Sequence, residues 1–498
     1  MKYIDYKQLN PFQKFAYNFT NFFKKLPGRV AAFFKAIGRF FVRLFTGIGK
    51  GVANYVTRFI KGDWTVKLSY VVFGFGNMMK GQIIKGLLFL ATEVAYIYFM
   101  ISFGFIYLSK FGTLGTVETQ QVKDGPFTKT VFGDNSMLIL LYSVLTIVVT
   151  LVVFFIYIAN TKSAYKLQQL KSEGKHIMNF KEEMKDFLDG KFHITMLSLP
   201  VLLIAIFTIL PMIFMVLIAF TNYDKQHMPP GTLFTWVGLD NFASLVDITS
   251  GAKKGVTFLE LTKWTVVWAI FATFTNYILG MIVALMINKK GIKLKSLWRT
   301  LFVITIAVPQ FVSLLLMNQM LQTNGAINIL LSELTGQEVA IQFLNSTPLM
   351  ARVTVIIINC WVGIPYTILS ASGVLMNIPA DLYESARIDG AGPVKQFTKI
   401  TLPYMLFVTG PALITQFVGN INNFNVIYLL TGGGPSTENF YQAGYTDILV
   451  TWLFKLTMNQ QDYGLAAAIG ILVFIVCATL SLITFNMSKS AKDEEAFS

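Results

Sequence analysis

Amide side chains are concentrated in one apolar stretch of the sequence, residues 416–425, which holds four asparagines and one glutamine. Gln416, Asn420 and Asn423 are spaced four and three residues apart, so a helix would place them on one face. Each amide offers both a hydrogen-bond donor and an acceptor, which suits the hydroxyls of an uncharged sugar. In a membrane helix such side chains are costly unless they line a wet cavity or bond to neighbouring helices. The pattern therefore predicts a sugar site, with polar contact between helices as the alternative.

The sequence contains no arrangement of residues that is typical of an enzyme. It has no Gly-x-x-x-x-Gly-Lys-[Ser/Thr] phosphate-binding loop, and no carboxylate pair or nucleophile triad stands out. The only two cysteines, Cys360 and Cys477, fall inside apolar runs, and the three histidines are scattered. We therefore expect no catalytic residue, no metal site and no cofactor in this chain.

A polar stretch between two apolar runs, residues 377–403, has the signals of a helical hairpin. Pro379 is suited to the first turn of a helix, and Glu384 favours the positive N-terminal end of that helix. Gly390 is suited to ending the helix, and Pro393 is suited to beginning a second one. A compact hairpin on the membrane face has a shape that another protein can bind.

The same hairpin resembles the EAA loop of the permeases of ABC importers. The resemblance is carried by Glu384-Ser385-Ala386, by Gly390, and by Ile-Thr-Leu-Pro at 400–403, with Ser385 in place of the usual second alanine. It implies that the loop is a coupling helix held in a cleft of an ATPase subunit, and that ATP and Mg are bound by that partner. The coupling residues that it implies are Glu384, Ser385, Ala386, Asp389 and Gly390.

Three further segments are similar to sugar-importer permeases of the maltose type (MalF-like). They are Trp-Val-Gly-Leu-Asp-Asn-Phe at 236–242, Leu-Thr-Gly-Gly-Gly-Pro at 430–435, and Gly-Leu-Ala-Ala-Ala at 464–468. The resemblance covers roughly residues 195–490 and implies import by alternating access. It implies four partners: a second homologous permease (MalG-like), two ATPase subunits (MalK-like) and an extracellular sugar-binding protein. The connection 222–263 is too short for the large insert of the enterobacterial form, which fits a Gram-positive-type version.

The resemblance also extends the predicted sugar site. Val362, Gly363 and Tyr366 match one substrate-binding stretch of the maltose permease, and Gly419, Asn420 and Asn423 match another. Gly419 replaces an aromatic residue that stacks on the sugar, which implies a roomier pocket. The expected substrate is a malto-oligosaccharide or related sugar, and the expected site residues are Tyr366, Gly363, Asn420, Asn423, Gly419 and Gln416.

Composition and apolar segments predict an all-α membrane protein. Of the 498 residues, 54% are hydrophobic and 13% are charged, whereas soluble domains have about a quarter charged residues. Eight segments are long enough to span the roughly 20 residues that a bilayer requires. We place them near 82–108, 136–160, 194–221, 264–288, 300–321, 350–375, 404–430 and 463–487. This predicts a six-helix permease core that is preceded by two further spans.

The distribution of basic residues predicts the orientation of these segments. Lysines crowd the connections around 162–185 and 289–299, whereas the connection 322–348 has no lysine or arginine. Under the positive-inside rule both termini and the 377–403 loop are cytoplasmic. We expect four parts: a basic interfacial region at 1–80, two spans and a loop at 81–193, the permease core at 194–490, and a tail at 491–498.

The N-terminal residues 1–62 combine basic and aromatic side chains. Phe12, Phe15, Phe19 and Phe22 recur at helical spacing, which predicts a helix in the plane of the lipid headgroups. Nucleic-acid binding is a less favoured alternative because the apolar face is continuous.

A secondary transporter or channel that works without ATP is the alternative function for the whole chain. It predicts charged residues at mid-membrane, for which Glu93 is the one strong candidate. For Glu93 we favour a structural role, in which its carboxylate is paired or lies near an interface.

Overall fold

The computed structural model describes residues 35, 38–39, 41–124, 126–248, 253–289 and 291–487. The phenylalanines of the predicted interfacial helix, Phe12 to Phe22, and the predicted tail at 491–498 lie outside the described residues. Residues 41–61 are helical and mostly exposed.

The chain divides into two units by its internal contacts. The first contains residues 1–109 and 142–205, and the second contains residues 110–141 and 206–498. The helices that lie wholly or partly in the first unit are α3 (Trp64–Leu68), α4 (Phe75–Met79), α5 (Ile83–Phe99), η1 (Met100–Gly104), α6 (Phe105–Lys110), α7 (Ser136–Ser172), α8 (Phe180–Leu188), α9 (Phe192–Ile204) and η2 (Ala205–Ile209).

The first unit is fastened by polar contacts between the turn after α3 and the long helix α7. The side chain of Asn160 accepts a hydrogen bond from the Gly74 backbone N–H and donates one to the Ser69 carbonyl. Glu93 of α5 accepts a hydrogen bond at 2.8 Å from the Phe73 backbone N–H, so its carboxylate is paired, as the structural interpretation expected.

The second unit contains a short hairpin and the remaining helices. The strands β1 (Gln120–Asp124) and β2 (Phe127–Val131) pair antiparallel, with Gln120 opposite Val131. The helices are α10 (Leu210–Ile218), α11 (Asp240–Val246), α12 (Lys253–Asn288), α13 (Lys295–Ile304), η3 (Thr305–Ala307), α14 (Gln310–Met320), α15 (Ala326–Thr335), α16 (Pro348–Met376), α17 (Ala380–Ile388), α18 (Pro393–Gln396), η4 (Phe397–Thr401), α19 (Leu402–Ile421), α20 (Phe424–Thr431), α21 (Leu449–Lys455), η5 (Leu456–Gln460) and α22 (Tyr463–Met487).

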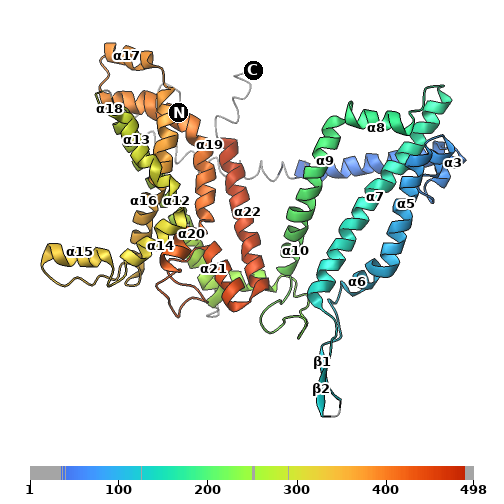
Figure 1. Cartoon of the computed structure of the whole chain (residues 1–498), viewed down its shortest axis with the longest axis horizontal. Helices are drawn as coiled ribbons and strands as arrows, with labels where there is room; N and C mark the ends of the chain where they lie inside the picture. The colour runs from blue at the N-terminus through green and yellow to red at the C-terminus, as the bar shows by residue number, and fades with distance from the viewer. Residues whose placement is uncertain are drawn as a thin grey trace. The chain divides into compact units, whose positions relative to one another are not determined.

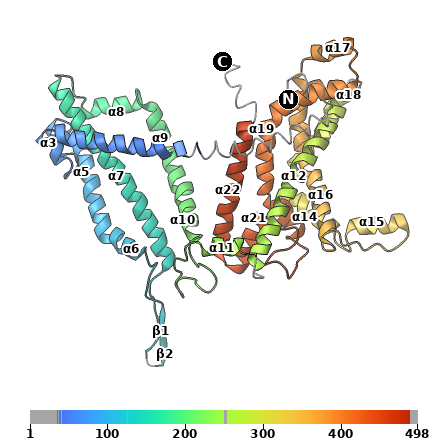
Figure 2. The same ribbon diagram turned by 180° about the vertical axis from the view of Figure 1, so that it is seen from behind.

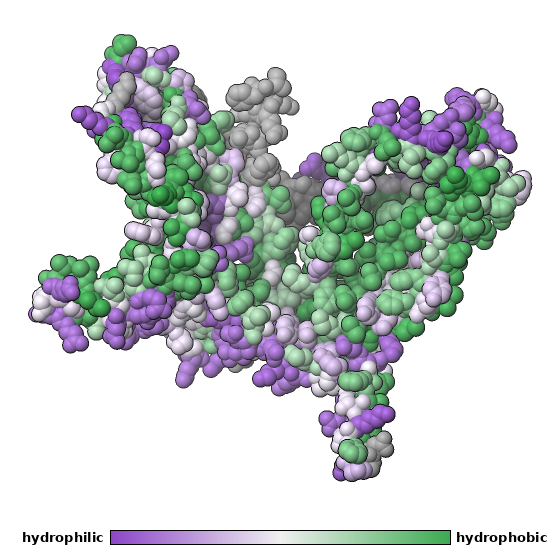
Figure 3. Space-filling model, viewed as in Figure 1, coloured by the Kyte–Doolittle hydropathy of each residue, from purple (hydrophilic) through white to green (hydrophobic). Residues whose placement is uncertain are grey.

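Helix α12 is the centre of the second unit, because it packs along both α16 and α19. Trp264 and Trp268 of α12 are buried in a core that also contains Leu314 of α14, Val355 of α16 and Ile427 of α20. The helices α17 and α18 lie at one end of these spans and α21 lies at the other, as both views show (Figure 1, Figure 2). Apolar side chains cover the helices between two polar ends (Figure 3).

The described residues contain seven helices that are long and apolar enough to cross a membrane, and an eighth span if a bent pair is counted as one. The bent pair is Lys295–Ala307 with Gln310–Met320, and its two halves meet at 88°. It corresponds to the predicted segment 300–321. Pro309 lies at the bend, where its ring and its missing N–H prevent the helix from continuing. The predicted all-α membrane fold is therefore confirmed, although the segment 300–321 is a bent pair (the broken span) and the predicted span 404–430 is divided at Asn422 between α19 and α20.

Candidate functional site

Gly363, one of the predicted sugar-site residues, lies in the contact between α16 and α12. A Cβ atom at this position would lie 2.0 Å from the Asn276 side-chain nitrogen, so any larger residue would have to displace the Asn276 side chain. Gly280 of α12 faces Thr367 of α16 one turn away in the same way. Gly363 is thus part of a close helix packing, and Asn276 takes the space beside it.

Asn420 is buried where α19 packs against α12. Its side-chain nitrogen donates to the Thr273 hydroxyl at 2.9 Å, and its side-chain oxygen accepts from the Asn423 amide at 3.2 Å. Its backbone carbonyl accepts from the indole nitrogen of Trp268 at 3.0 Å. Asn423 also caps α20, since its side-chain oxygen accepts from the Val426 backbone N–H. In the conformation described here, both amides are engaged between helices.

Tyr366 is separated from that amide cluster. It lies on α16 with 53% of its surface exposed and lines a small cavity of about 130 Å³ at the broken span. The cavity lining contains none of the other five predicted residues. Its members are Thr305, Ile306, Val308, Gln310, Ser313, Trp361, Val362 and Tyr366.

Gln416 and Gly419 lie on α19 and are the more accessible members of the predicted set. Gly419 is exposed, and a Cβ atom at this position would have no neighbour within 4 Å. Gln416 is half-buried, and its amide forms no hydrogen bond with any other described residue. These two positions leave room for a ligand, whereas Gly363 does not.

The predicted hairpin at 377–403 is present as α17 and α18. Asp381 lies in the first turn of α17, Gly390 has a φ of +74° after its end, and Pro393 begins α18. The hydroxyls of Tyr383 and Thr401 are 2.8 Å apart and fasten α17 to the start of the following span. Glu384, Ser385, Asp389 and Gly390 are exposed and Ala386 is half-buried, so the five predicted coupling residues lie together in one loop.

Sequence reasoning missed the residues of α12 that hold these helices, Trp268, Thr273 and Asn276, and it missed the cavity beside Pro309. Asn276 is buried, and its side-chain oxygen has no hydrogen-bond partner among the described residues. A polar residue inside the predicted span 264–288 and a proline inside the predicted span 300–321 were the available signals.

A helical membrane fold with an amide-lined span and an exposed hairpin of α17 and α18 is typical of a known class of protein, the permeases of ABC importers. The family of binding-protein-dependent transport system inner membrane components matches residues 276–492. Relatives above 30% identity extend over most of the chain, and the chain belongs to this family.

The relatives come mainly from sugar transport systems. The chain is 34% identical to the maltodextrin transport system permease protein MdxF of Bacillus subtilis over 432 residues, which are 85% of this chain and 95% of MdxF. It is 34% identical to the galactooligosaccharides transport system permease protein GanP of the same organism, over 85% of this chain and 97% of GanP. It is 36% identical to the maltose/maltodextrin permease MalF of Escherichia coli K12, over 55% of this chain and 52% of MalF.

The chain is also similar to a solved structure of a bacterial ABC transporter involved in the import of the acidic polysaccharide alginate. Its TM-score is 0.48 at 23% identity, and the match covers 61% of this chain and 98% of that one.

Proposed function

We propose that this chain is the membrane-spanning permease subunit of an ATP-driven importer that translocates a malto-oligosaccharide or related sugar. The observation that carries the proposal is the identity of 34% over 85% of the chain to permeases of both maltodextrin and galactooligosaccharide systems. Both relatives serve neutral oligosaccharides, which the uncharged amides of α19 suit. The ATP-independent alternative has no such support, and Glu93 is already paired with the protein backbone.

The loop formed by α17 and α18 is the proposed site of coupling to a partner ATPase. Three apolar side chains of this otherwise polar loop are exposed: Leu382 by 47%, Ile388 by 87% and Val394 by 77%. Exposed apolar side chains with a polar rim are typical of a protein-binding surface. The partner ATPase would bind ATP and Mg and carry out hydrolysis, and Glu384 would mark its docking position.

The remaining partners and the orientation are part of the same proposal. The permease would pair with a second homologous subunit (MalG-like), with two ATPase subunits (MalK-like) and with an extracellular sugar-binding protein. The loop of α17 and α18 and both termini would face the cytoplasm of a Gram-positive-type bacterium, as the lysine-rich connections predict. The end of the spans that carries α21 would then face outward.

The six predicted residues have different parts in the proposed sugar site. Tyr366, Gln416 and Gly419 would contact the sugar, because their side chains or surfaces are accessible. Asn420 and Asn423 would reach it after exchanging their present hydrogen bonds, a change that rocking of the spans can supply. Gly363 would act by allowing α16 to lie close to α12.

The test is uptake by the complete transporter in proteoliposomes with the binding protein outside. We expect ATP-dependent accumulation of radiolabelled maltotetraose or galactotetraose, and we expect charged sugars to compete poorly. Accumulation that continues without ATP inside the vesicles would contradict the importer assignment and restore the ATP-independent alternative.

A further inference from the structure

A polar cup lies at the end of the second unit opposite α17 and α18. Its volume is about 620 Å³, which is within the range of small-molecule sites. Four separate parts of the chain form it: the start of α12, the connection before α16, the end of α20 with the loop that follows it, and the end of α21 with η5. Its lining residues are Lys253, Asn345, Thr431, Gly432, Gly433, Gly434, Ser436, Thr437, Glu438, Phe440, Gln442, Ala443, Gly444, Lys455, Asn459 and Gln460.

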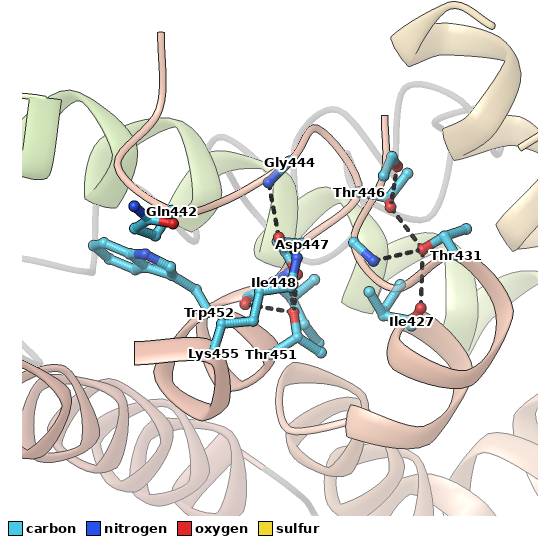
Figure 4. Close-up of polar contacts among 12 residues, drawn as sticks. Ile427, Thr431, Gln442, Gly444, Thr446, Asp447, Ile448, Thr451, Trp452 and Lys455 are labelled. Carbon is cyan, nitrogen blue, oxygen red and sulfur yellow. Dashed lines mark hydrogen bonds and ion pairs between the residues drawn. The ribbon is translucent and has the colours of Figure 1, made fainter. Parts of the chain in front are cut away.

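A buried carboxylate outside the lining fixes the loop that forms much of the cup. Asp447 is fully buried and pairs with the Lys455 ammonium group at 2.6 Å. It also accepts hydrogen bonds from the Gly444 backbone N–H and the Thr451 hydroxyl, both at 2.8 Å. Figure 4 shows these groups converging on Asp447 from the loop and from α21. A buried charge with all of these partners holds the loop in one shape.

Close backbone contacts rigidify the rim. A Cβ atom on Gly433 would lie 2.1 Å from a carboxylate oxygen of Asp447, and one on Gly444 would lie 2.2 Å from the Gly433 carbonyl oxygen. The Thr431 and Thr446 hydroxyls are 2.8 Å apart and connect the two ends of the loop (Figure 4). The loop is therefore pre-organised, which lowers the entropy that a ligand must remove on binding.

Several polar side chains of the lining have no protein partner among the described residues. The side chains of Asn345, Ser436 and Asn459 are exposed and form no hydrogen bond with the described part of the chain. Phe440 adds an aromatic face beside them. Free amides and a hydroxyl next to an aromatic ring provide hydrogen bonds to sugar hydroxyls and an apolar surface for the sugar C–H groups.

The charges of the cup favour an uncharged ligand. Lys455 is neutralised by Asp447, and the other two charged lining residues, Lys253 and Glu438, have opposite signs. A phosphorylated or acidic ligand would gain no net attraction there.

We propose that this cup is a second saccharide-binding site, separate from the site on α16 and α19. The cup would hold a neutral oligosaccharide at the outer face. The inference rests on the proposed sugar-import function, which supplies both the ligand class and the orientation.

The experiment uses the complete transporter in nanodiscs without the binding protein, and maltotetraose with a photoreactive diazirine at its reducing end. After illumination, labelled peptides are identified by mass spectrometry, with excess unlabelled maltotetraose as competitor. We expect competable labelling in 431–444 or 456–460. Asn459→Ala and Asn345→Ala, on separate segments, should each reduce it about fivefold, the effect of one lost hydrogen bond. Asn439→Ala is the matched control, because Asn439 is exposed in the same loop but outside the lining.

The outcomes separate this inference from the proposed function. Labelling confined to α16 and α19, in a transporter that accumulates maltotetraose, would overturn the cup and leave the importer intact. Labelling of the cup that is unchanged in both alanine variants would also overturn it. The affinity of the same nanodiscs for added binding protein is measured in parallel. If the variants weaken that affinity and leave sugar labelling unaltered, the cup docks protein and the saccharide assignment is wrong. A wild-type transporter that accumulates neither maltotetraose nor galactotetraose, and that the maltotetraose probe does not label, would instead contradict the proposed function.

Discussion

At Gly363 the contact between α12 and α16 depends on a missing side chain. Gly363 leaves just enough space for the buried amide of Asn276, while Gly373 of the same helix has no atom within 4 Å of its Cβ position. The two glycines therefore have different roles despite their shared helix. The sequence motif pointed to Gly363 as a substrate residue, but no sequence pattern could have shown that its neighbour would be an asparagine 87 residues earlier in the chain.

Gly363→Ala is expected to destabilise the second unit by about 1–3 kcal/mol, because the added methyl group overpacks the contact with Asn276. The measurement is the melting temperature of the purified transporter, with Gly373→Ala as the matched control. Adding Asn276→Ala should recover most of the loss. Equal melting temperatures for the two glycine variants would contradict the packing role.

Asn423→Ala is expected to weaken the stimulation of ATPase activity by sugar without preventing assembly. Removing its side chain takes away a predicted sugar contact and also the cap of α20, which is worth about 0.5–2 kcal/mol. Asn425→Ala is the control, since Asn425 is exposed and its side chain forms no hydrogen bond with the described residues. A sugar dependence equal to that of the control would remove Asn423 from the site.

At the scale of elements, the spans were predictable and their interruptions were not. Six of the predicted apolar segments became continuous helices because their length and composition leave few alternatives in a bilayer, whereas 404–430 is divided at Asn422 between α19 and α20. The bend at Pro309 could have been anticipated from the proline alone, but no sequence signal indicates its 88° angle or the packing of α14 against α20. Likewise, composition showed that the amides of α19 need partners, and only the fold shows that Thr273 supplies one.

The hairpin of β1 and β2 is expected to loosen in acid, because its base is held by the Asp134 carboxylate. A hydrogen bond from the Lys110 ammonium group and others from the Thr116 and Val117 backbone lower the pKa of Asp134. Because the pKa is lowered, the stabilisation is complete above the ordinary aspartate pKa of about 4. It is lost as the pH falls through the lowered pKa of Asp134. Hydrogen-exchange protection of the Thr116 and Val117 amides should decrease over that range. Asp134→Asn should remove this pH dependence, and a variant that retains it would contradict the assignment.

The loop of α17 and α18 is the element through which the chain is expected to receive the energy of ATP. Glu384→Lys is expected to abolish uptake while membrane insertion remains normal, because it reverses a charge on the proposed docking surface. Uptake in vesicles and the amount of protein in the membrane are the two readouts. Glu173→Lys, another exposed acid in a connection between helices, is the control. Normal uptake by the Glu384 variant would disprove the coupling assignment.

At the scale of the whole molecule, the chain has the surface of a subunit rather than of a complete transporter. Its loop of α17 and α18 exposes apolar side chains to water, and its predicted sugar contacts are divided between an amide cluster and a cavity at the broken span. Both features are explained if other subunits cover them. Purification from the native membrane should therefore recover a second permease and an ATPase in fixed proportion.

The bend at Pro309 has a consequence for the life of the protein in the cell. Each half of the broken span is too short to cross the bilayer alone, and a break frees backbone groups that hydrocarbon cannot satisfy. If the proposed partner permease covers this break, a chain synthesised without that partner would expose it to lipid and become a target for membrane proteases. Pulse-chase labelling should then show rapid turnover of the orphan chain, and co-expression of the partner gene should prolong its half-life.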